Sequence, residues 1–289
     1  MSYAAKLTKP QKIDLADFDP SETKGVTEEA AREEAIRLGM ELRDLQELLY
    51  AASTHSVLIV LQGTDTAGKD GTISHVFASV NPQGVSVASF KQPTPQELAH
   101  DFLWRIHQHA PAKGAMTIFN RSHYEDVLAV RVHELVPEKV WKKRYGIINE
   151  FEEQLAANDT IVLKFFLHIS KKEQEKRLLA RENDVAKSWK LSPGDWRERK
   201  FWDEYQEAYA DMLAKTSAED APWYVVPANH KWLRNLAVAE ALVGTLRGYK
   251  SDWEKKLKKV GEQARAELKQ MRAENGGEKN RTHTGGKAE

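Results

Sequence analysis

The stretch Ser56-Val-Leu-Ile-Val-Leu-Gln-Gly63-Thr-Asp-Thr-Ala-Gly-Lys69 decides the fold of this chain. Its first half is a continuous apolar run, too short for a helix and typical of a strand buried in a parallel sheet. Its second half has a glycine, four further residues and then Gly-Lys, which predicts a loop that cradles phosphate at the start of a helix. Strand, loop and helix therefore follow in the order that a phosphate site requires.

The side chains inside this loop predict its chemistry. Lys69 would follow the charge of a phosphoryl group as it transfers. Asp70 stands where most such loops carry the Ser or Thr that holds Mg²⁺, and Asp65 adds a carboxylate inside the loop. Because a carboxylate facing phosphates requires a cation between them, we expect Asp65 to bind Mg²⁺ or its water, with Thr72 as a weaker candidate. A turn-forming role is the alternative for Asp65.

The loop and the first turn of the helix are expected to contact phosphate or nucleotide together. The residues concerned are Gly63, Thr66, Ala67, Gly68, Lys69, Asp70, Gly71 and Thr72. A solvated glycine-rich turn would explain the glycines, but it would not explain the strand before them and the helix after them.

A second group of polar residues follows the apolar run Met116-Thr-Ile-Phe119. Ligands of open parallel sheets bind at the carboxyl ends of the strands, so Asn120 and Arg121 should point toward the phosphates as catalytic residues. Asn120 can orient a metal-bound water, and Arg121 can clamp a phosphate with its planar fork. We assign Glu125 to phosphate or nucleotide binding and Asp126 to catalysis, with stabilisation of a helix N-terminus as the alternative for both.

A basic segment stands out in a chain of zero net charge. Residues 171–200 hold ten Lys and Arg against six Asp and Glu, whereas the whole chain has 43 of each kind. Arg177 and Arg181 are four positions apart on one face of a predicted helix, as in lids that close over transferred phosphates. We expect Lys187 and Arg199 to extend this phosphate-binding surface, although a solvated charged face would also explain the segment.

Strands alternate with helices along the body of the chain, as in a parallel α/β sheet. Besides the strand at 56–61, strands are predicted at 84–89, 116–119, 160–168 and 223–226. Helices are predicted from Thr27 onward and at 94–109, 170–181, 192–213 and 232–246. The expected fold is an α/β P-loop kinase with a parallel five-stranded sheet, flanking helices and a helical lid.

The domain organisation follows from the same pattern. We expect an N-terminal extension over 1–25, a kinase domain over 26–253 with its lid at about 181–200, and a tail over 254–289 that begins helical and ends disordered. The tail is rich in charge and has no apolar periodicity after about Leu268.

Composition excludes several classes of protein. With 41% hydrophobic residues among 289 the chain can bury a core, and without cysteine it has no disulfides, thiolate metal sites or cysteine nucleophiles. No apolar run approaches the ~20 residues of a membrane span, and the first residues do not read as a secretion signal. We therefore expect a cytoplasmic protein that binds neither membranes nor nucleic acid.

Four ordered motifs resemble polyphosphate kinase family 2. They are Gly63-Thr-Asp-Thr-Ala-Gly-Lys-Asp-Gly71, Phe119-Asn-Arg-Ser-His-Tyr-Glu-Asp-Val127, Lys187-Ser-Trp-Lys-Leu-Ser-Pro-Gly-Asp195 and Thr216-Ser-x-x-x-Ala-Pro-Trp223. The resemblance implies a thymidylate-kinase-like fold and reversible, Mg²⁺-dependent (or Mn²⁺-dependent) phosphoryl transfer between inorganic polyphosphate and a nucleotide. Asn120, where other members carry Asp, resembles class III, which converts AMP and ADP to ADP and ATP.

The resemblance also carries over site residues and partners. The matching family positions are Asp65, Lys69, Asn120, Arg121, Arg177 and Arg181, with Glu125 and Asp126 as further candidates. It implies polyphosphate and adenine nucleotides as partners, other bases being possible, and a homo-oligomer is the expected assembly.

Two other functions are compatible with part of the pattern. An ATP-dependent nucleotide kinase would share the fold, the loop and the lid. A GTPase-like switch needs Ser or Thr after the loop lysine and an Asn-Lys-x-Asp motif, and Asn229-His-Lys-Trp232 does not supply that motif. Nucleic-acid binding would explain the basic segment, but it would explain neither Asp65 nor the phosphate loop.

Overall fold

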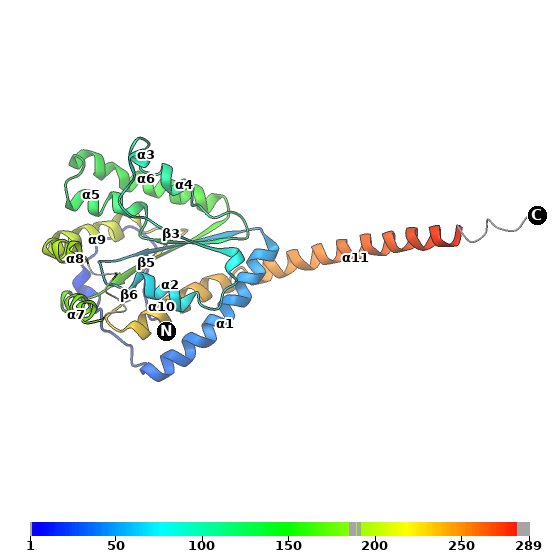
Figure 1. The fold of residues 1–289 in the computed structure, drawn as a ribbon, viewed down its shortest axis with the longest axis horizontal. Coiled ribbons are helices and arrows are strands. Elements are labelled where there is room, and N and C mark those ends of the chain that lie inside the picture. Colours follow the sequence, from blue (N-terminus) through cyan, green and yellow to red (C-terminus); the bar gives the residue numbers. More distant parts are fainter. Residues whose placement is uncertain (1, 185–188, 190–191, 282–289) are drawn as a thin grey trace, which may run out of the picture.

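Six strands form one sheet in the order β1-β6-β5-β2-β4-β3 (Figure 1). The computed structural model describes residues 2–184, 189 and 192–281. The strands are β1 (Ala5–Leu7), β2 (Ser56–Gln62), β3 (Val85–Ser89), β4 (Met116–Asn120), β5 (Thr160–His168) and β6 (Trp223–Pro227). Strands β2 to β6 pair in parallel, so their carboxyl ends share one edge of the sheet.

The centre of the sheet is β2, the apolar strand that precedes the phosphate loop. Val57 pairs with Met116 of β4 on one side and with Ile161 of β5 on the other. Every residue of β2 is buried, because side chains that alternate across the strand meet a core on both faces. This position between two long neighbours fixes the loop at the middle of the carboxyl edge.

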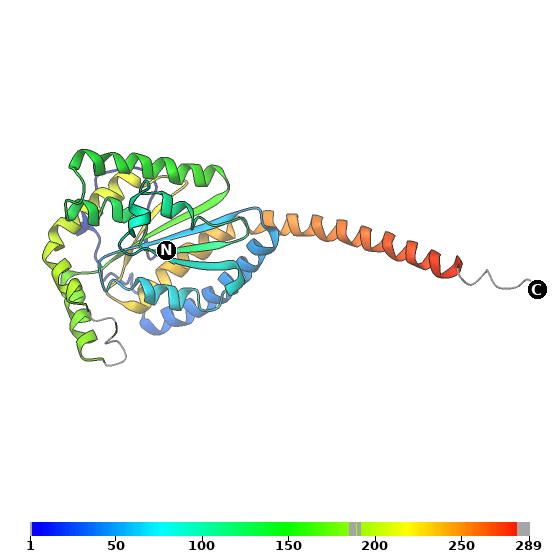
Figure 2. The same ribbon diagram turned by 45° about the horizontal axis from the view of Figure 1, so that its top comes forward.

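Helices cover both faces of the sheet (Figures 1 and 2). One face carries α1 (Glu28–Ala52), α2 (Lys69–Val76) and α10 (Lys231–Arg247), and the other carries α6 (Glu138–Ala157) and α9 (Trp202–Thr216). The remaining helices are α3 (Pro95–Leu98), α4 (Trp104–His107), α5 (Ala129–Val132), α7 (Lys171–Glu182), α8 (Pro193–Glu198) and α11 (Lys250–Arg281). Short 3₁₀ turns are η1 (Leu15–Asp17), η2 (Pro82–Gly84), η3 (His123–Asp126) and η5 (Arg199–Phe201).

The expectation of a five-stranded, wholly parallel sheet is wrong in one respect. All five predicted strands are present, but β1 adds a sixth, which pairs antiparallel with β6 through Ala5 and Val225. This strand lies inside the predicted N-terminal extension. It escaped prediction because three residues carry no readable alternation, and the edge of β6, rather than an apolar run of its own, determines their conformation.

Two predicted helices are interrupted. In place of a single helix over 94–109, α3 and α4 are separate, and the Asp101 carboxylate accepts a hydrogen bond from the Leu103 backbone N–H (3.0 Å), which starts a new turn. In place of a single helix over 192–213, α8, η5 and α9 follow one another. The break lets α8 contact α7 while α9 packs against α6.

The last helix, α11, leaves the body of the molecule and extends away from it (Figures 1 and 2). Its first turns are fixed by Trp253, which is fully buried and donates from Nε1 to His55 Nδ1 (3.2 Å). No helix in the described residues is both long enough and apolar enough to cross a bilayer.

Candidate active site

The phosphate loop connects the carboxyl end of β2 to the first turn of α2. Gly63 has φ 150°, and a Cβ there would lie 2.7 Å from the Leu167 carbonyl oxygen. Gly68 has φ 110°, and a Cβ there would lie 1.8 Å from Arg234 Nη1. Conformation and space both require glycine at position 63, whereas at position 68 the positive φ favours glycine and a Cβ would also displace the Arg234 side chain. Ala67, between them, is fully buried.

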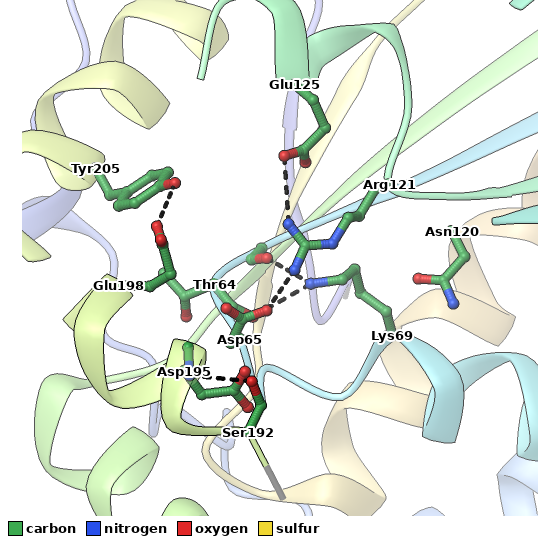
Figure 3. Close-up of polar contacts among 12 residues, drawn as sticks. Thr64, Asp65, Lys69, Asn120, Arg121, Glu125, Ser192, Asp195, Glu198 and Tyr205 are labelled. Atoms are coloured by element: carbon green, nitrogen blue, oxygen red, sulfur yellow. Dashed lines mark hydrogen bonds and ion pairs between the residues drawn. The ribbon is translucent and has the colours of Figure 1, made fainter. Parts of the chain in front are cut away.

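Lys69 is buried at the start of α2 and folds back over the loop. Its Nζ donates to the carbonyl oxygens of Gly63 (2.6 Å) and Thr64 (3.3 Å) (Figure 3). Burial, helped by the positive charge of Arg121, lowers the pKa of Lys69 to about 8. Burial disfavours the charged form of Lys69, and an anion bound in the loop would favour it again. The ammonium group is therefore well placed to bind phosphate.

Arg121 links the loop to the second strand end. It follows β4 with φ 62°, and its guanidinium donates to Asp65 Oδ1 (2.5 Å) and to Glu125 Oε2 (3.3 Å) (Figure 3). The two carboxylates, Glu125 foremost, raise the pKa of Arg121 above its usual range. Asp65, Arg121 and Glu125, each a candidate from the sequence, therefore lie together in the structure.

Asn120 and Asp70 form a second contact across the same edge. The Asn120 amide Nδ2 donates to Asp70 Oδ1 (2.9 Å), so the carboxylate after the loop lysine is held by the next strand end. Thr72 is buried, and its hydroxyl donates to the Gly68 carbonyl oxygen (3.2 Å). That bond uses the only proton of the hydroxyl, so in this conformation the Thr72 side chain is bonded within its own helix.

Asp126 lies deeper, beside Arg144 of α6. The Arg144 Nη1 donates to Asp126 Oδ1 (2.7 Å) and to the Asp126 carbonyl oxygen (3.2 Å). Burial raises the pKa of Asp126 to about 6, although Arg144 opposes that shift. The pKa of Asp126 therefore lies closer to neutrality than that of a solvent-exposed carboxylate, as is common for groups at functional sites.

A cavity of about 400 Å³ opens beside the loop. Its basic lining residues come from several parts of the chain and include Arg105, Arg121 and Arg199. Aromatic and apolar side chains form the rest of the wall, among them Phe90 and Tyr205. The size and the mixed lining suit a small anionic molecule with an apolar part.

The two lid arginines are placed differently from the expectation that both face the phosphates. Arg177 is buried behind the loop, where Nη1 donates to the carbonyl oxygens of Thr66 and Ala67 (3.0 Å each) and Nη2 donates to those of Ala228 and Asn229 (2.6 and 2.9 Å). These bonds tie α7, the loop and the end of β6 together. Helical spacing placed Arg177 on the correct face of α7 but could not tell how deeply it is buried.

Arg181 lies one turn further along α7 and binds across to α8. Its Nη1 donates to Asp195 Oδ2 (2.8 Å), and burial raises the pKa of Asp195 above its usual value. Arg199 donates to the Lys171 carbonyl oxygen (2.7 Å) and to Gln174 Oε1 (2.9 Å), and it lines the cavity. Lys187 lies outside the described residues.

Arg234 of α10 is a loop contact that sequence reasoning missed. It is buried, packs against Gly68 and Gly71, and donates from Nη1 to the Ala67 carbonyl oxygen (3.4 Å). Burial and the nearby Arg177 lower the pKa of Arg234 to about 10. The signal available in the sequence was only an arginine on a helix after the last strand, which does not indicate proximity to the loop.

A buried ionic network supports the second strand end and was also missed. Glu152 of α6 accepts from Lys164 Nζ (2.5 Å) and from the Tyr124 hydroxyl (2.8 Å), and His123 Nε2 lies 3.1 Å from it. All four side chains are almost fully buried. Removing one partner of such a network costs about 3–5 kcal/mol, because a charge is left unpaired in the core. It therefore fixes η3, which carries Glu125 and Asp126.

Few ligands for a divalent cation are in place. The described residues contain no group of three or more His, Cys, Asp or Glu side chains that could hold a metal. Mg²⁺ usually takes one or two protein carboxylates and completes its octahedron with phosphate oxygens and water. Asp65, inside the loop, fits that arrangement. The buried hydroxyls of Thr64 and Thr66, which have no hydrogen-bond partner within the described structure, fit phosphate oxygens.

A phosphate loop with its lysine, reached by charged side chains from the next strand end and open to a cavity for a small acceptor, defines a P-loop phosphotransferase. The chain belongs to the polyphosphate kinase 2 family, whose model matches residues 25–254. The fold and family expected from the motifs are thereby confirmed. The assignment of individual site residues stays a prediction.

Several relatives are similar over most of their length. The AMP/ADP-polyphosphate phosphotransferase of Meiothermus ruber is 55% identical over 239 residues, 82% of this chain and 90% of that protein. The ADP-polyphosphate phosphotransferase of Rhodopseudomonas palustris is 44% identical over 256 residues, 84% of this chain and 89% of that protein. The crystal structure of polyphosphate kinase 2 from Arthrobacter aurescens TC1 matches with a TM-score of 0.81 at 44% identity, covering 84% of this chain and 88% of that one.

Proposed function

We propose that this protein transfers the terminal phosphoryl group of inorganic polyphosphate to AMP and to ADP, giving ADP and ATP, and that the reaction is reversible and depends on Mg²⁺. The observation that carries the proposal is the cavity of about 400 Å³ that opens onto the phosphate loop. It offers a nucleotide an apolar wall and a basic end, while the loop remains for the donor chain. The relatives named for AMP and ADP as acceptors support the choice of nucleotide.

The charged side chains have distinct roles in this reaction. An oxygen of the acceptor phosphate attacks the terminal phosphorus of polyphosphate, and the bond to the shortened chain breaks. Lys69 and Arg121 would stabilise the charge on the transferring group, since both donate hydrogen bonds to residues of the loop, Lys69 to the Gly63 carbonyl oxygen and Arg121 to the Asp65 carboxylate. Asp65 would hold Mg²⁺, which when bound neutralises charge on the phosphate oxygens.

One assay separates this function from an ATP-dependent nucleotide kinase. Purified protein receives ADP or AMP, Mg²⁺ and polyphosphate with no added ATP, and product is followed by luminescence and ³¹P NMR. We expect ATP from ADP only when polyphosphate is present. In Lys69→Met we expect turnover to fall by about 100-fold or more, because one electrostatic contact to the transition state is lost. Phosphorylation of AMP by ATP but not by polyphosphate would contradict the proposal.

The metal role of Asp65 is tested by charge removal. Asp65→Asn keeps the size and the turn but removes the ligand charge, so we expect lower turnover and a higher Mg²⁺ concentration at half-maximal rate. Asp70→Asn is the matched control, since Asp70 is held by Asn120 and should shift the Mg²⁺ titration less. A wild-type Mg²⁺ titration for Asp65→Asn would leave Asp65 with only its turn-forming role.

A further inference from the structure

Arg105 of α4 is a buried arginine that lines the cavity beside the phosphate loop. The residue is only 6% exposed, and its guanidinium lies over the Phe90 ring, 5.5 Å from the ring centre. Its Nη1 donates to the Lys91 carbonyl oxygen (2.9 Å), and among the residues that the structure describes it has no other hydrogen bond and no ion pair. A guanidinium has five N–H donors, so most of those of Arg105 have no partner there. Burying a charge in this way is costly unless an anion binds beside it.

The carboxylates near Arg105 are engaged by other groups. Burial raises the pKa of Asp126, and the positive charges of Arg144 and then of Arg105 oppose that shift. Of these two arginines, Arg144 is the one bonded to the carboxylate, through Nη1 (2.7 Å). Glu97 accepts a hydrogen bond from the Thr94 backbone N–H (2.6 Å) in the capping box of α3. Two arginines around one buried carboxylate leave a positive charge in excess at this end of the cavity.

Two other arginines line the same cavity in the described part of the chain, and both already have carboxylate partners. Arg121 is held by two carboxylates, and Arg199 donates from Nη2 to Glu175 Oε2 (2.7 Å). A phosphate that bound to either arginine would compete with these partners. A phosphate that bound to Arg105 would meet donors that no carboxylate occupies, and charge-assisted hydrogen bonds to phosphate are strong.

The position of Arg105 in the fold separates it from the group in transfer. Lys91, whose carbonyl oxygen holds the guanidinium, follows β3, whereas the loop follows β2, and β4 lies between these strands. Neighbouring strands are about 4.8 Å apart, so the end of β3 is roughly 10 Å from the loop. The cavity extends from one to the other. An acceptor phosphate on Arg105 would therefore lie beside the transferring group rather than in its place.

We propose that Arg105 binds the phosphate next to the ribose of the acceptor nucleotide, so that AMP and ADP are held by the same contact. The inference rests on the proposed function and adds to it a residue that determines specificity. A nucleoside lacks this phosphate, so Arg105 makes the cavity select nucleotides over nucleosides. The Phe90 ring under the guanidinium fixes the plane in which its donors point.

Calorimetry of nucleotide binding without polyphosphate tests this contact apart from catalysis. Arg105→Met keeps an unbranched side chain over Phe90 but removes the charge. We expect the affinities for AMP and ADP to fall about 10- to 100-fold, because hydrogen bonds to a charged group are lost, and Arg105→Lys should recover part of the loss. The affinity for adenosine should stay that of the wild type. Equal losses for adenosine and AMP, or an unchanged affinity for AMP, would overturn the proposal.

Steady-state kinetics separates the acceptor from the donor. Arg105→Met should raise the KM for AMP and ADP and change the KM for polyphosphate little. Arg131→Met is the matched control, since Arg131 also lies over an aromatic ring, that of Trp141, but has its own partner in Asp211 (2.6 Å) and lies outside the cavity. It should leave the KM for both nucleotides near the wild-type value.

Two results would contradict the assignment of Arg105: a rise confined to the KM for polyphosphate, or an equal rise in nucleotide KM for the two methionine variants. Failure of the wild type to form ATP from polyphosphate would refute the proposed function instead. The calorimetric comparison of AMP with adenosine would then still decide the role of Arg105.

Discussion

At the scale of single residues, Lys69 couples phosphate binding to pH. In the free protein burial lowers its pKa to about 8, so the ammonium loses its proton as the pH rises through 8. Bound phosphate favours the charged form and raises that pKa, so binding takes up protons near pH 8 and weakens above it. We expect calorimetry of tripolyphosphate binding in buffers of different ionisation heat to show this uptake. Lys69→Met should lack it, and equal proton uptake in both proteins would contradict the assignment.

Arg177 should contribute to the stability of the fold, whereas a lid residue would affect only the reaction rate. Its guanidinium satisfies four backbone carbonyls in a buried place, so Arg177→Ala should lower the free energy of unfolding by about 3 kcal/mol. Arg181→Ala, which removes one ion pair near the surface, should cost about 1 kcal/mol or less. Urea unfolding of both variants checks this difference. Equal midpoints would mean that the loop does not depend on Arg177.

Local sequence predicted the residues of the loop better than the residues that support it. Asp65, Lys69 and Arg121 follow strands directly, so their place at the carboxyl edge could be read from the order of elements. Arg234 and Glu152 act from helices distant in the chain, and nothing in their neighbourhood distinguishes them from surface charges. Helix periodicity gives direction around an axis, but depth of burial depends on packing that only the whole fold supplies.

At the scale of elements, Glu198 joins α5 to α9 along the cavity. Its carboxylate accepts from the Tyr205 hydroxyl (2.9 Å) (Figure 3). The same carboxylate lies 2.9 Å from His133 Nε2. Glu198→Gln removes the charge from this junction, so the wall of the cavity should loosen. We expect the KM for AMP and ADP to rise roughly tenfold, because a tenfold change corresponds to the free energy of one hydrogen bond to a charged group.

The KM for polyphosphate should change less, because Glu198 lines the cavity that we propose for the nucleotide. Glu207→Gln is the matched control on α9, since Glu207 lies outside this cavity and its nearest ion pair, to Arg131, is 3.8 Å long. Steady-state kinetics with each substrate varied in turn gives the comparison. A parallel rise in both KM values would indicate a general loss of structure instead.

Prediction of elements succeeded where a strand or helix carries its own signal. The runs that became β2 and β5 are rich in apolar residues and buried along their whole length, and Thr27 caps α1 as its position indicated. The breaks after α3 and after α8 could not be predicted, because the flanking residues have acceptable helix propensity and tertiary contacts decide the turn. The same holds for β1, which exists only beside β6.

At the scale of the whole molecule, α11 consists of a first part that stabilises the fold and a second part that projects from the body. Trp253 is fully buried, and Leu257 packs against the core. A chain ending after Lys259 keeps both, so we expect its melting temperature and its turnover to match those of the full chain. A chain ending after Asp252 loses the indole, which should cost about 3–5 kcal/mol of stability.

Thermal unfolding and the polyphosphate assay on the two shortened proteins give the result. The domain boundary predicted near residue 253 requires this difference. Loss of stability in the chain that ends after Lys259 would move the boundary further along α11.

The pairing of β1 with β6 has a consequence for the way the chain is made. Ala5 leaves the ribosome 220 residues before its partner Val225, which emerges only after almost the whole kinase domain. At about 5–20 residues per second, the first strand waits roughly ten to forty seconds for its neighbour. During translation the sheet can grow from β2, β4 and β5, but its outer edge stays open until β6 arrives. The first of the six described strands to be synthesised is thus the one that completes the sheet.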